Sequence, residues 1–166
     1  WLKESTLPYT ILHNTSYAEM IPLFIGDKVI VTGRLIYPAG NGRVPFATKP
    51  DMVEAAANTI LSLKHKGKSY IITNSVTYSF HDVAKEISRA TGTKIEYSSP
   101  SQNEFRSMLK NAGVSDGMIG FAAGFAEAYR KGEFDRISGD LEMLLGRKPV
   151  PLEKYINSVY GNNNKK

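Results

Sequence analysis

Short runs of strand-forming residues alternate with helical segments over the first 100 residues of the chain. Three runs rich in β-branched and aromatic residues predict strands, and they cover residues 9–13, 69–73 and 93–97. The first two are expected to be buried. Two shorter apolar runs, residues 29–32 and 35–37, flank Gly33 and predict a small hairpin. The alternation predicts an α/β fold for this part of the chain.

Capping residues and apolar spacing predict two helices among these strands. The first covers residues 52–63 and follows Asp51, whose carboxylate can cap it. Its buried face is expected to comprise Val53, Ala56, Ala57, Ile60 and Leu61. The second helix begins with Ser79 and Asp82, which have the spacing of a capping box, and ends at Gly92.

From residue 101 onward the pattern becomes mostly helical. Four helices are expected, over residues 102–112, 116–131, 139–145 and 152–159. We therefore divide the chain into an α/β unit (1–100), a helical lobe (101–160) and a polar tail (161–166). The chain starts with Trp1 in place of Met, which suggests a fragment or a processed product.

Composition narrows the classes of function that the chain can have. It contains no cysteine, which excludes disulfides, thiolate metal sites and cysteine nucleophiles. It has neither a run of about 18 apolar residues nor a signal peptide, which favours a cytoplasmic protein without a membrane span. The net charge is +5, but the lysines and arginines form no stripe with interleaved aromatic residues, so no nucleic-acid partner is expected.

The usual motifs of dinucleotide chemistry are missing from these residues. A dinucleotide-binding fold normally has a glycine-rich turn between its first strand and helix, whereas Gly40 and Gly42 lead to Pro45 and no helix. None of the nine tyrosines has a lysine four residues later, so an acid/base tyrosine–lysine pair is not encoded.

The three histidines are scattered, and their spacing predicts no metal site. His65 lies between two lysines, where we expect a solvated helix end. His81 is expected to be exposed in the first turn of a helix. His13 differs from both because it ends a predicted buried strand.

The polar residues around the end of that strand are the best candidates for a site. Ligands of open α/β sheets gather at the carboxyl ends of strands. His13 stands at this end, and it is followed directly by Asn14, Thr15, Ser16 and Tyr17. The alternative interpretation of these residues is the ordinary polarity of a loop.

Several segments of the chain resemble, in order, the C-terminal half of NmrA-like atypical short-chain dehydrogenases. They are residues 9–14 with Tyr17, Gly40-x-Gly42, residues 47–51 with the alanine-rich helix, residues 67–70 with 72–73, and residues 141–149. Among these proteins the NAD(P)H:quinone oxidoreductase branch is the most similar, and the resemblance covers nearly the whole chain. The chain departs from the family at His13, where the family commonly has Arg, and by lacking the glycine-rich turn.

The resemblance implies the C-terminal part of a Rossmann-like NAD(P)-binding fold with a smaller, mostly helical substrate-side lobe. NADPH or NADH would bind mostly to a part that is absent from this chain, and a quinone-like acceptor would take a hydride from it. The resemblance places Asn14, Thr15, Ser16 and Tyr17 along the cleft. Asn14 and Tyr17 would orient the ligand, and Phe46 would form an apolar wall.

Alternatives to this interpretation stay open. Some NmrA-like proteins sense dinucleotides without turning them over, so the chain could belong to a regulatory protein. A relative that acts on nucleotide sugars would need the missing tyrosine–lysine pair. The chain alone could also be an inert fragment whose exposed sheet edge pairs with other chains, and a homodimer is a further option.

Overall fold

The computed structural model describes residues 2–161 and has the α/β organisation that the sequence predicts. Strand β1 (Ile11–Asn14) pairs in parallel with β3 (Ser69–Ile72), and β2 (Arg34–Ile36) pairs in parallel with β4 (Glu96–Ser98). The helices are α1 (Met20–Ile25), α2 (Val29–Thr32), α3 (Lys49–Ile60), α4 (Phe80–Thr91), α5 (Gln102–Asn111), α6 (Asp116–Arg130), α7 (Asp140–Leu145) and α8 (Leu152–Tyr160), with short 3₁₀ turns η1 (Leu2–Glu4) and η2 (Leu63–His65).

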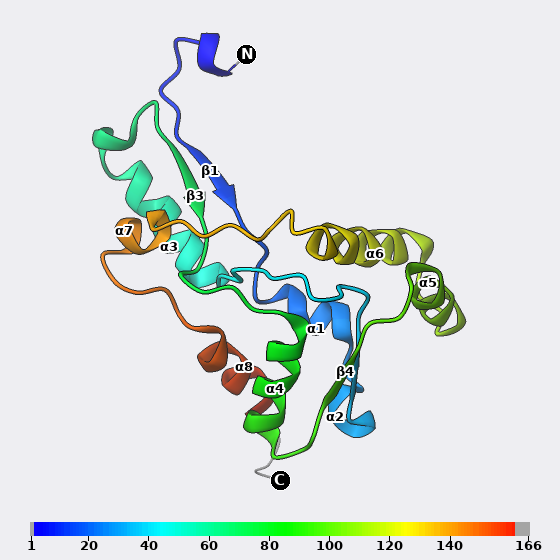
Figure 1. Cartoon of the computed structure of the whole chain (residues 1–166). Coiled ribbons are helices and arrows are strands. Elements are labelled where there is room, and N and C mark those ends of the chain that lie inside the picture. The colour runs from blue at the N-terminus through cyan, green and yellow to red at the C-terminus, as the bar shows by residue number, and fades with distance from the viewer. Residues whose placement is uncertain (1, 162–166) are drawn as a thin grey trace.

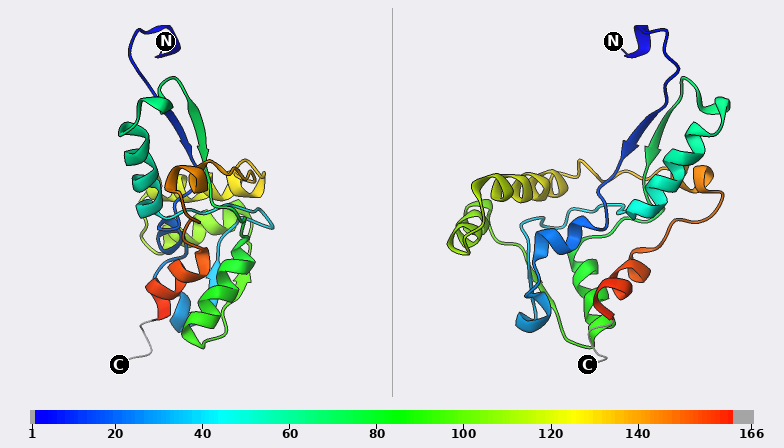
Figure 2. Two further views of the ribbon diagram at one scale, coloured as in Figure 1. Left: turned by 90° about the vertical axis from the view of Figure 1, so that its left-hand side faces the viewer. Right: turned by 180° about the vertical axis from the view of Figure 1, so that it is seen from behind.

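The four helices after residue 101 do not gather in one place. Helices α5 and α6 pack on each other and extend sideways as an arm (Figure 1), whereas α7 packs on α3 and β3 and α8 packs on α4. The two further views show the same arrangement (Figure 2). Of the helices in the expected helical lobe, only α5 and α6 pack closely on each other among the described residues. The division of the chain at residue 100 stays a prediction.

An aromatic core joins the arm to the rest of the molecule. Tyr37, Phe46, Phe80 and Tyr129 are almost completely buried, and the centroids of their contacting rings are 4.6–6.3 Å apart. A smaller apolar cluster, which includes Ile72, lies between β3, α3 and α7. Burial of this apolar surface is the main source of stability.

Most local predictions are confirmed. The strands at 9–13, 69–73 and 93–97 are present with shifted ends. The expectation that the first of them is buried was wrong, because β1 pairs with β3 alone among the described strands and His13 and Asn14 are exposed. Ser79 and Asp82 form the expected capping box at the start of α4, and Gly92 ends that helix with a left-handed backbone (φ 71°). Of the predicted polar tail, residues 162–166 lie outside the described part of the chain, as does Trp1.

The predicted hairpin at residues 29–37 was wrong. Val29–Thr32 is a single helical turn that Gly33 ends with a left-handed backbone (φ 64°). Its β-branched residues favour strand locally, but Val29 is buried in the aromatic core, and this packing outweighs the local preference. The following segment does form a strand, but β2 pairs with β4, far along the chain.

The predicted cap and buried face of α3 were also wrong. The helix starts earlier than expected, at Lys49, because the Thr48 hydroxyl caps it by accepting a hydrogen bond from the backbone N–H of Asp51. Three residues of the expected face, Val53, Ile60 and Leu61, are 68–84% exposed. The face turned inward instead consists of Asp51, Met52, Ala55 and Thr59.

The Asp51 carboxylate explains why α3 turns this face inward rather than the predicted one. It is 1% exposed, accepts a hydrogen bond from the Val150 N–H (2.7 Å) and pairs with the Arg147 guanidinium (2.8 Å). A buried carboxylate needs such partners. The contact therefore ties the first turn of α3 to the segment between α7 and α8.

His65 is not the solvated helix end that the sequence predicted. Its side chain is 5% exposed, and its Nδ1 atom lies 2.7 Å from the Tyr70 hydroxyl on β3. Burial lowers the pKa of His65, and the positive charges of Lys64 and Lys68 lower it further. His81, by contrast, is exposed as expected.

Replacing Asp51 with alanine should reduce stability markedly. Asp51→Ala leaves the partly buried Val150 N–H without its acceptor and Arg147 without its buried partner, and we expect the free energy of unfolding to fall by about 2–3 kcal/mol in urea denaturation. Glu54→Ala is the matched control, because Glu54 pairs with the same Arg147 but is 45% exposed. That variant should lose less than about 1 kcal/mol, and equal losses in both would contradict the assigned role of Asp51.

The lowered pKa of His65 predicts a specific pH dependence. The unfolded chain takes up a proton near pH 6.5, whereas folded His65 resists protonation until a lower pH. The His65 contribution to stability is therefore complete above pH 6.5 and is lost progressively as the pH falls toward the folded pKa. Urea denaturation at several pH values should show a smaller loss of stability below pH 6.5 in His65→Gln than in the unmodified chain, and equal losses would contradict the role of His65.

Candidate functional site

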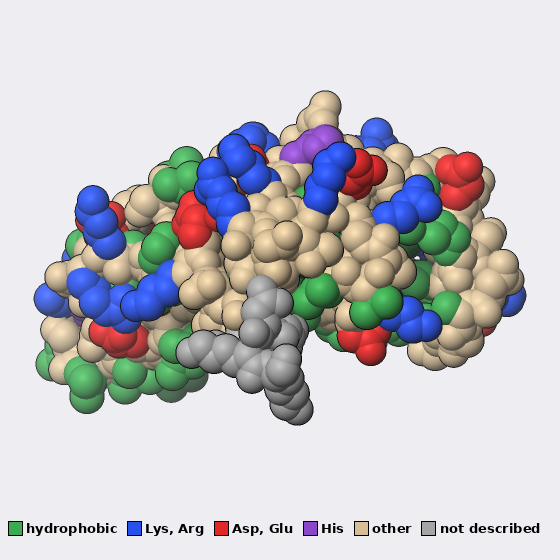
Figure 3. All heavy atoms as spheres, turned by 90° about the horizontal axis from the view of Figure 1, so that it is seen from below, with side chains coloured by type: hydrophobic (Ala, Val, Ile, Leu, Met, Phe, Trp, Pro, Cys, Tyr) green, Lys and Arg blue, Asp and Glu red, His purple; other side chains and the backbone are tan. Residues whose placement is uncertain are grey.

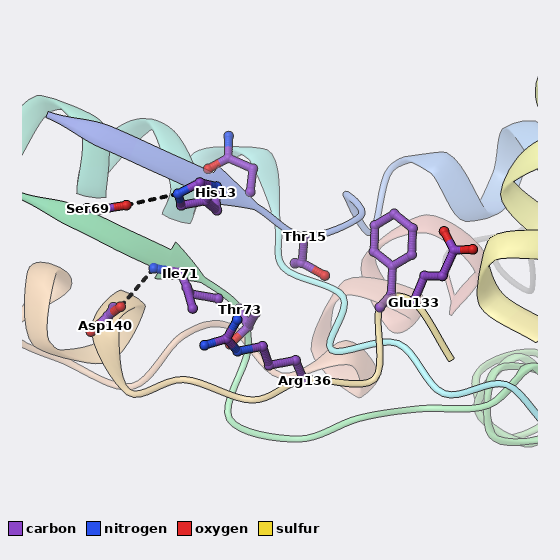
Figure 4. Close-up of a pocket in the computed structure, with 10 residues that line it drawn as sticks. His13, Thr15, Ser69, Ile71, Thr73, Glu133, Arg136 and Asp140 are labelled. Atoms are coloured by element: carbon purple, nitrogen blue, oxygen red, sulfur yellow. Dashed lines mark hydrogen bonds between the residues drawn. The ribbon is translucent and has the colours of Figure 1, made fainter. Parts of the chain in front are cut away.

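A pocket of about 400 Å³ opens at the carboxyl ends of β1 and β3 (Figure 4). We call it the polar pocket. It is lined by His13, Asn14, Thr15, Ser69, Ile71, Thr73, Glu133, Phe134, Arg136 and Asp140. Three of the residues predicted from the strand end, His13, Asn14 and Thr15, thus line a cavity, and the segment after α6 forms its opposite side.

Hydrogen bonds hold several groups of the polar pocket in place. His13 Nε2 lies 2.8 Å from the Ser69 hydroxyl on the neighbouring strand. The Asp140 carboxylate accepts a hydrogen bond from the Ile71 N–H (2.7 Å). The first bond links β1 to β3, and the second links α7 to β3 (Figure 4). These groups therefore shape the pocket rather than point freely into it.

Glu133 and Arg136 provide charges at this pocket. Both side chains are exposed, and neither forms an ion pair with another residue of the described chain. Figure 4 shows them on the segment opposite the strand ends. Exposed charges of this kind remain available to a polar or anionic ligand.

A second pocket of about 270 Å³ adjoins the first, and we call it the aromatic pocket. It is lined by Asn14, Thr15, Ser16, Tyr17, Met20, Phe121, Phe125 and Phe134. Asn14, Thr15 and Phe134 line both pockets. The two cavities therefore meet at the residues that follow β1, with hydrogen-bonding groups on one side and aromatic rings on the other.

Thr15 carries a buried hydroxyl at this junction that has no partner among the described residues. Its side chain is 9% exposed, and its hydroxyl oxygen makes no hydrogen bond with any described residue. A buried hydroxyl without a partner is costly, and such groups are rare in folded proteins. The Thr15 hydroxyl thus has unused hydrogen-bonding capacity in a residue that lines both pockets.

Ser16 lies beside Thr15 but faces the core. Its hydroxyl and the Tyr129 hydroxyl on α6 are 2.5 Å apart. Burial raises the pKa of Tyr129 far above its ordinary value, and the bond to Ser16 lowers it only in part. Tyr129 therefore stays protonated and serves as a hydrogen-bond partner of Ser16.

Tyr17 lines the aromatic pocket, whereas Phe46 lies in the core. The Tyr17 ring borders the aromatic pocket, and the Lys49 ammonium lies 5.7 Å from its centroid. Phe46 lies in the core, 1% exposed, with its ring 6.1 Å from that of Tyr129. Phe46 therefore supports the site from behind, and the adjacent Ala47 pairs with the backbone of residues 16–18.

The aromatic wall and the charged segment were missed by sequence reasoning. Phe121 and Phe125 stand four residues apart on α6 and so share one helix face. This spacing was a signal that could have identified the wall. Phe134 and Arg136 gave no comparable signal, since only the packing of α6 brings them to the ends of β1 and β3.

Within residues 2–161, no group of three or more histidines, aspartates or glutamates could hold a metal ion. The helices in this part of the chain are all too short or too polar to cross a membrane.

Sequence comparison gives relatives among oxidoreductases. No protein-family model matches the chain. It is 28% identical over 163 residues to quinone oxidoreductase 2 of Escherichia coli, covering 98% of this chain and 57% of that protein. An NmrA-like oxidoreductase of Aspergillus flavus is 24% identical over 153 residues, covering 90% of this chain and 49% of its own length. The chain therefore spans about half the length of its homologues.

Solved structures agree with these relatives. The NADPH-dependent quinone oxidoreductase of Escherichia coli, in complex with NADPH, superposes with a TM-score of 0.90 at 27% identity, covering 96% of this chain and 56% of that one. The triphenylmethane reductase of Citrobacter, in complex with NADP(H), gives 0.84 at 27% identity, over 93% and 53%. The chain thus has the fold of about half of a Rossmann-like NAD(P)-binding reductase, which confirms the resemblance found in its sequence.

A double-mutant cycle should measure the bond between Ser16 and Tyr129. Ser16→Ala and Tyr129→Phe should each lower the free energy of unfolding by about 1–3 kcal/mol, because each leaves a buried hydroxyl unpaired. The double variant should lose less than the sum, with a coupling of about 1 kcal/mol. Tyr160→Phe combined with Ser16→Ala is the control, and these losses should add because the Tyr160 hydroxyl has no partner among the described residues.

Proposed function

We propose that this chain forms the substrate-side half of an NADPH-dependent oxidoreductase that transfers a hydride to a quinone-like acceptor. The Thr15 hydroxyl carries the proposal, because it is buried and unpartnered where the polar and aromatic pockets meet. The relatives named quinone oxidoreductase and triphenylmethane reductase support it, since both act on compounds with flat rings. A homodimer and a cytoplasmic location remain predictions from the sequence.

The polar pocket suits the reactive end of a nicotinamide cofactor. It lies at the carboxyl ends of two parallel strands, where α/β folds bind dinucleotides. Thr15 and Asn14 offer a hydroxyl and an amide that could hold a carboxamide, and Arg136 offers a cation for a phosphate. The bound cofactor would supply a hydride, and the remainder of its binding site would lie in the half that the homologues have in addition.

The aromatic pocket suits the acceptor. Phe121, Phe125 and Phe134 present ring surfaces against which a flat quinone can pack. An acceptor that packs on these rings would displace water from their surfaces, which favours direct hydride transfer. Because such a transfer depends mainly on holding two rings close together, the missing tyrosine–lysine pair does not weigh against it.

The reaction balances without a metal or an acidic side chain in this chain. A quinone that accepts a hydride, which carries two electrons and one proton, needs one further proton to become the hydroquinone. Water at the pocket mouth can provide that proton. The oxidised cofactor NADP⁺ is the other product.

The test is consumption of NADPH by the protein encoded in the complete reading frame, with small quinones as acceptors. Oxidation of NADPH with formation of one hydroquinone per cofactor would support the proposal. Binding of NADPH without turnover of any quinone would contradict it and favour the dinucleotide-sensing regulator. The structure of the negative transcriptional regulator NmrA, at 14% identity and a TM-score of 0.67, supports a shared fold alone.

Thr15→Val should separate stability from activity. Removing a buried, unpaired hydroxyl should leave the free energy of unfolding unchanged or raise it by up to about 1 kcal/mol. The same change removes a ligand contact, so kcat/KM with NADPH and quinone should fall about tenfold. Thr93→Val is the matched control on an exposed loop after α4 and should change neither. Unchanged kcat/KM in Thr15→Val would remove Thr15 from the site.

A further inference from the structure

A third cavity, which we call the outer pocket, lies between α1, α2, β2 and the helices α5 and α6. Its volume is about 390 Å³, within the range of small-molecule sites. Buried Phe24, Val29 and Phe105 line its inner part. The proposed function makes no use of this cavity.

Large apolar side chains stand exposed at its rim. Leu23, Met108 and Met118 are 51%, 44% and 39% exposed, and all three line the outer pocket. Seen from below, the end of the molecule that carries α5 is hollowed, and hydrophobic side chains line the hollow beside Lys or Arg side chains (Figure 3). Exposed apolar side chains that gather around a cavity mark a binding surface.

The charged residues of the outer pocket all have one sign. Lys28 and Arg34 line it, and no aspartate or glutamate does. Neither cation forms an ion pair with another described residue. Glu96, which pairs in register with Arg34 across β2 and β4, has its carboxylate bound to Lys94 instead. Two cations without a carboxylate in the pocket lining, beside an apolar cavity, are complementary to a ligand with an anionic head and an apolar body.

Aromatic rings separate this pocket from the proposed site. Phe24 lines the outer pocket, whereas Phe121 and Phe125 line the aromatic pocket, and the Phe24 ring packs on both, at 5.9 and 5.5 Å. The two cavities share no lining residue. A ligand can therefore occupy the outer pocket independently of the acceptor.

We propose that the outer pocket binds a small amphiphilic carboxylate, with its apolar body against Phe24, Phe105 and Met108 and its carboxylate at Lys28 and Arg34. Methionine side chains at the rim suit such a ligand, because they adapt to chains of different shape.

The five methionines of the chain make the test specific. Met108 and Met118 line the outer pocket, Met20 lines the aromatic pocket, and neither Met52 nor Met143 lines any of the three pockets. In a protein with ¹³C-labelled methionine methyl groups, titration with decanoate should shift the NMR signals of Met108 and Met118. The signals of Met20, Met52 and Met143 should stay in place.

Decanol and decylamine, which have the same chain with a neutral or a positive head, test the charge. Both should bind more weakly than decanoate. Arg34→Gln should weaken decanoate binding about three- to fivefold, as expected for one partly exposed ion pair. Arg106→Gln, which removes an equal charge from α5 outside the pocket lining, should have no such effect.

A variant that fills the outer pocket tests where decanoate binds. Ala112 lies at the exposed rim, so Ala112→Trp should block the outer pocket without disturbing the core, and decanoate shifts should disappear. Decanoate that shifts Met20 alone, or that shifts no methionine, would overturn the proposal. Equal affinities of decanol and decanoate would overturn the anionic class of ligand. Because the readout needs neither NADPH nor turnover, its failure would leave the proposed oxidoreductase function untouched.

Discussion

The packing of Tyr129 against the α/β part of the chain is the constraint on which the site depends. Its ring contacts Phe46 and Phe80, its hydroxyl binds Ser16, and its backbone touches Gly42 so closely that a Cβ there would lie 2.0 Å from the Tyr129 carbonyl oxygen. The segment that follows is held as a result. The Phe134 ring packs 5.1 Å from that of Tyr129, where it forms part of both the polar and the aromatic pocket.

Features that depend on neighbouring residues could be predicted from the sequence. The capping box of Ser79 and Asp82 needs only a spacing of three residues, and the structure contains it. The candidate site at Asn14 and Thr15 followed from a general property of α/β sheets, namely that ligands bind at the carboxyl ends of strands. Both residues line a pocket in the structure.

Features that depend on distant residues could not be predicted in this way. The outward turn of Val53 on α3 follows from the bond between the Asp51 carboxylate and the Val150 N–H, which no local pattern reveals. The helical turn at Val29 likewise results from burial among residues of other elements, against a local preference for strand. The opposite side of the polar pocket was missed for the same reason, since Arg136 reaches it only through the packing of α6.

The parallel pairing of the strands also sets an order of events during synthesis. Ile11 pairs with Ser69 and Arg34 with Glu96. Strands β1 and β2 can therefore pair only after a partner about 60 residues further along the chain has been synthesised. Parallel neighbours cannot be joined by a tight turn, which makes such pairing slow. At the usual rate of translation, β1 leaves the ribosome several seconds before β3 exists. During that interval the β1 groups that bond to β3 in the folded protein lack this partner.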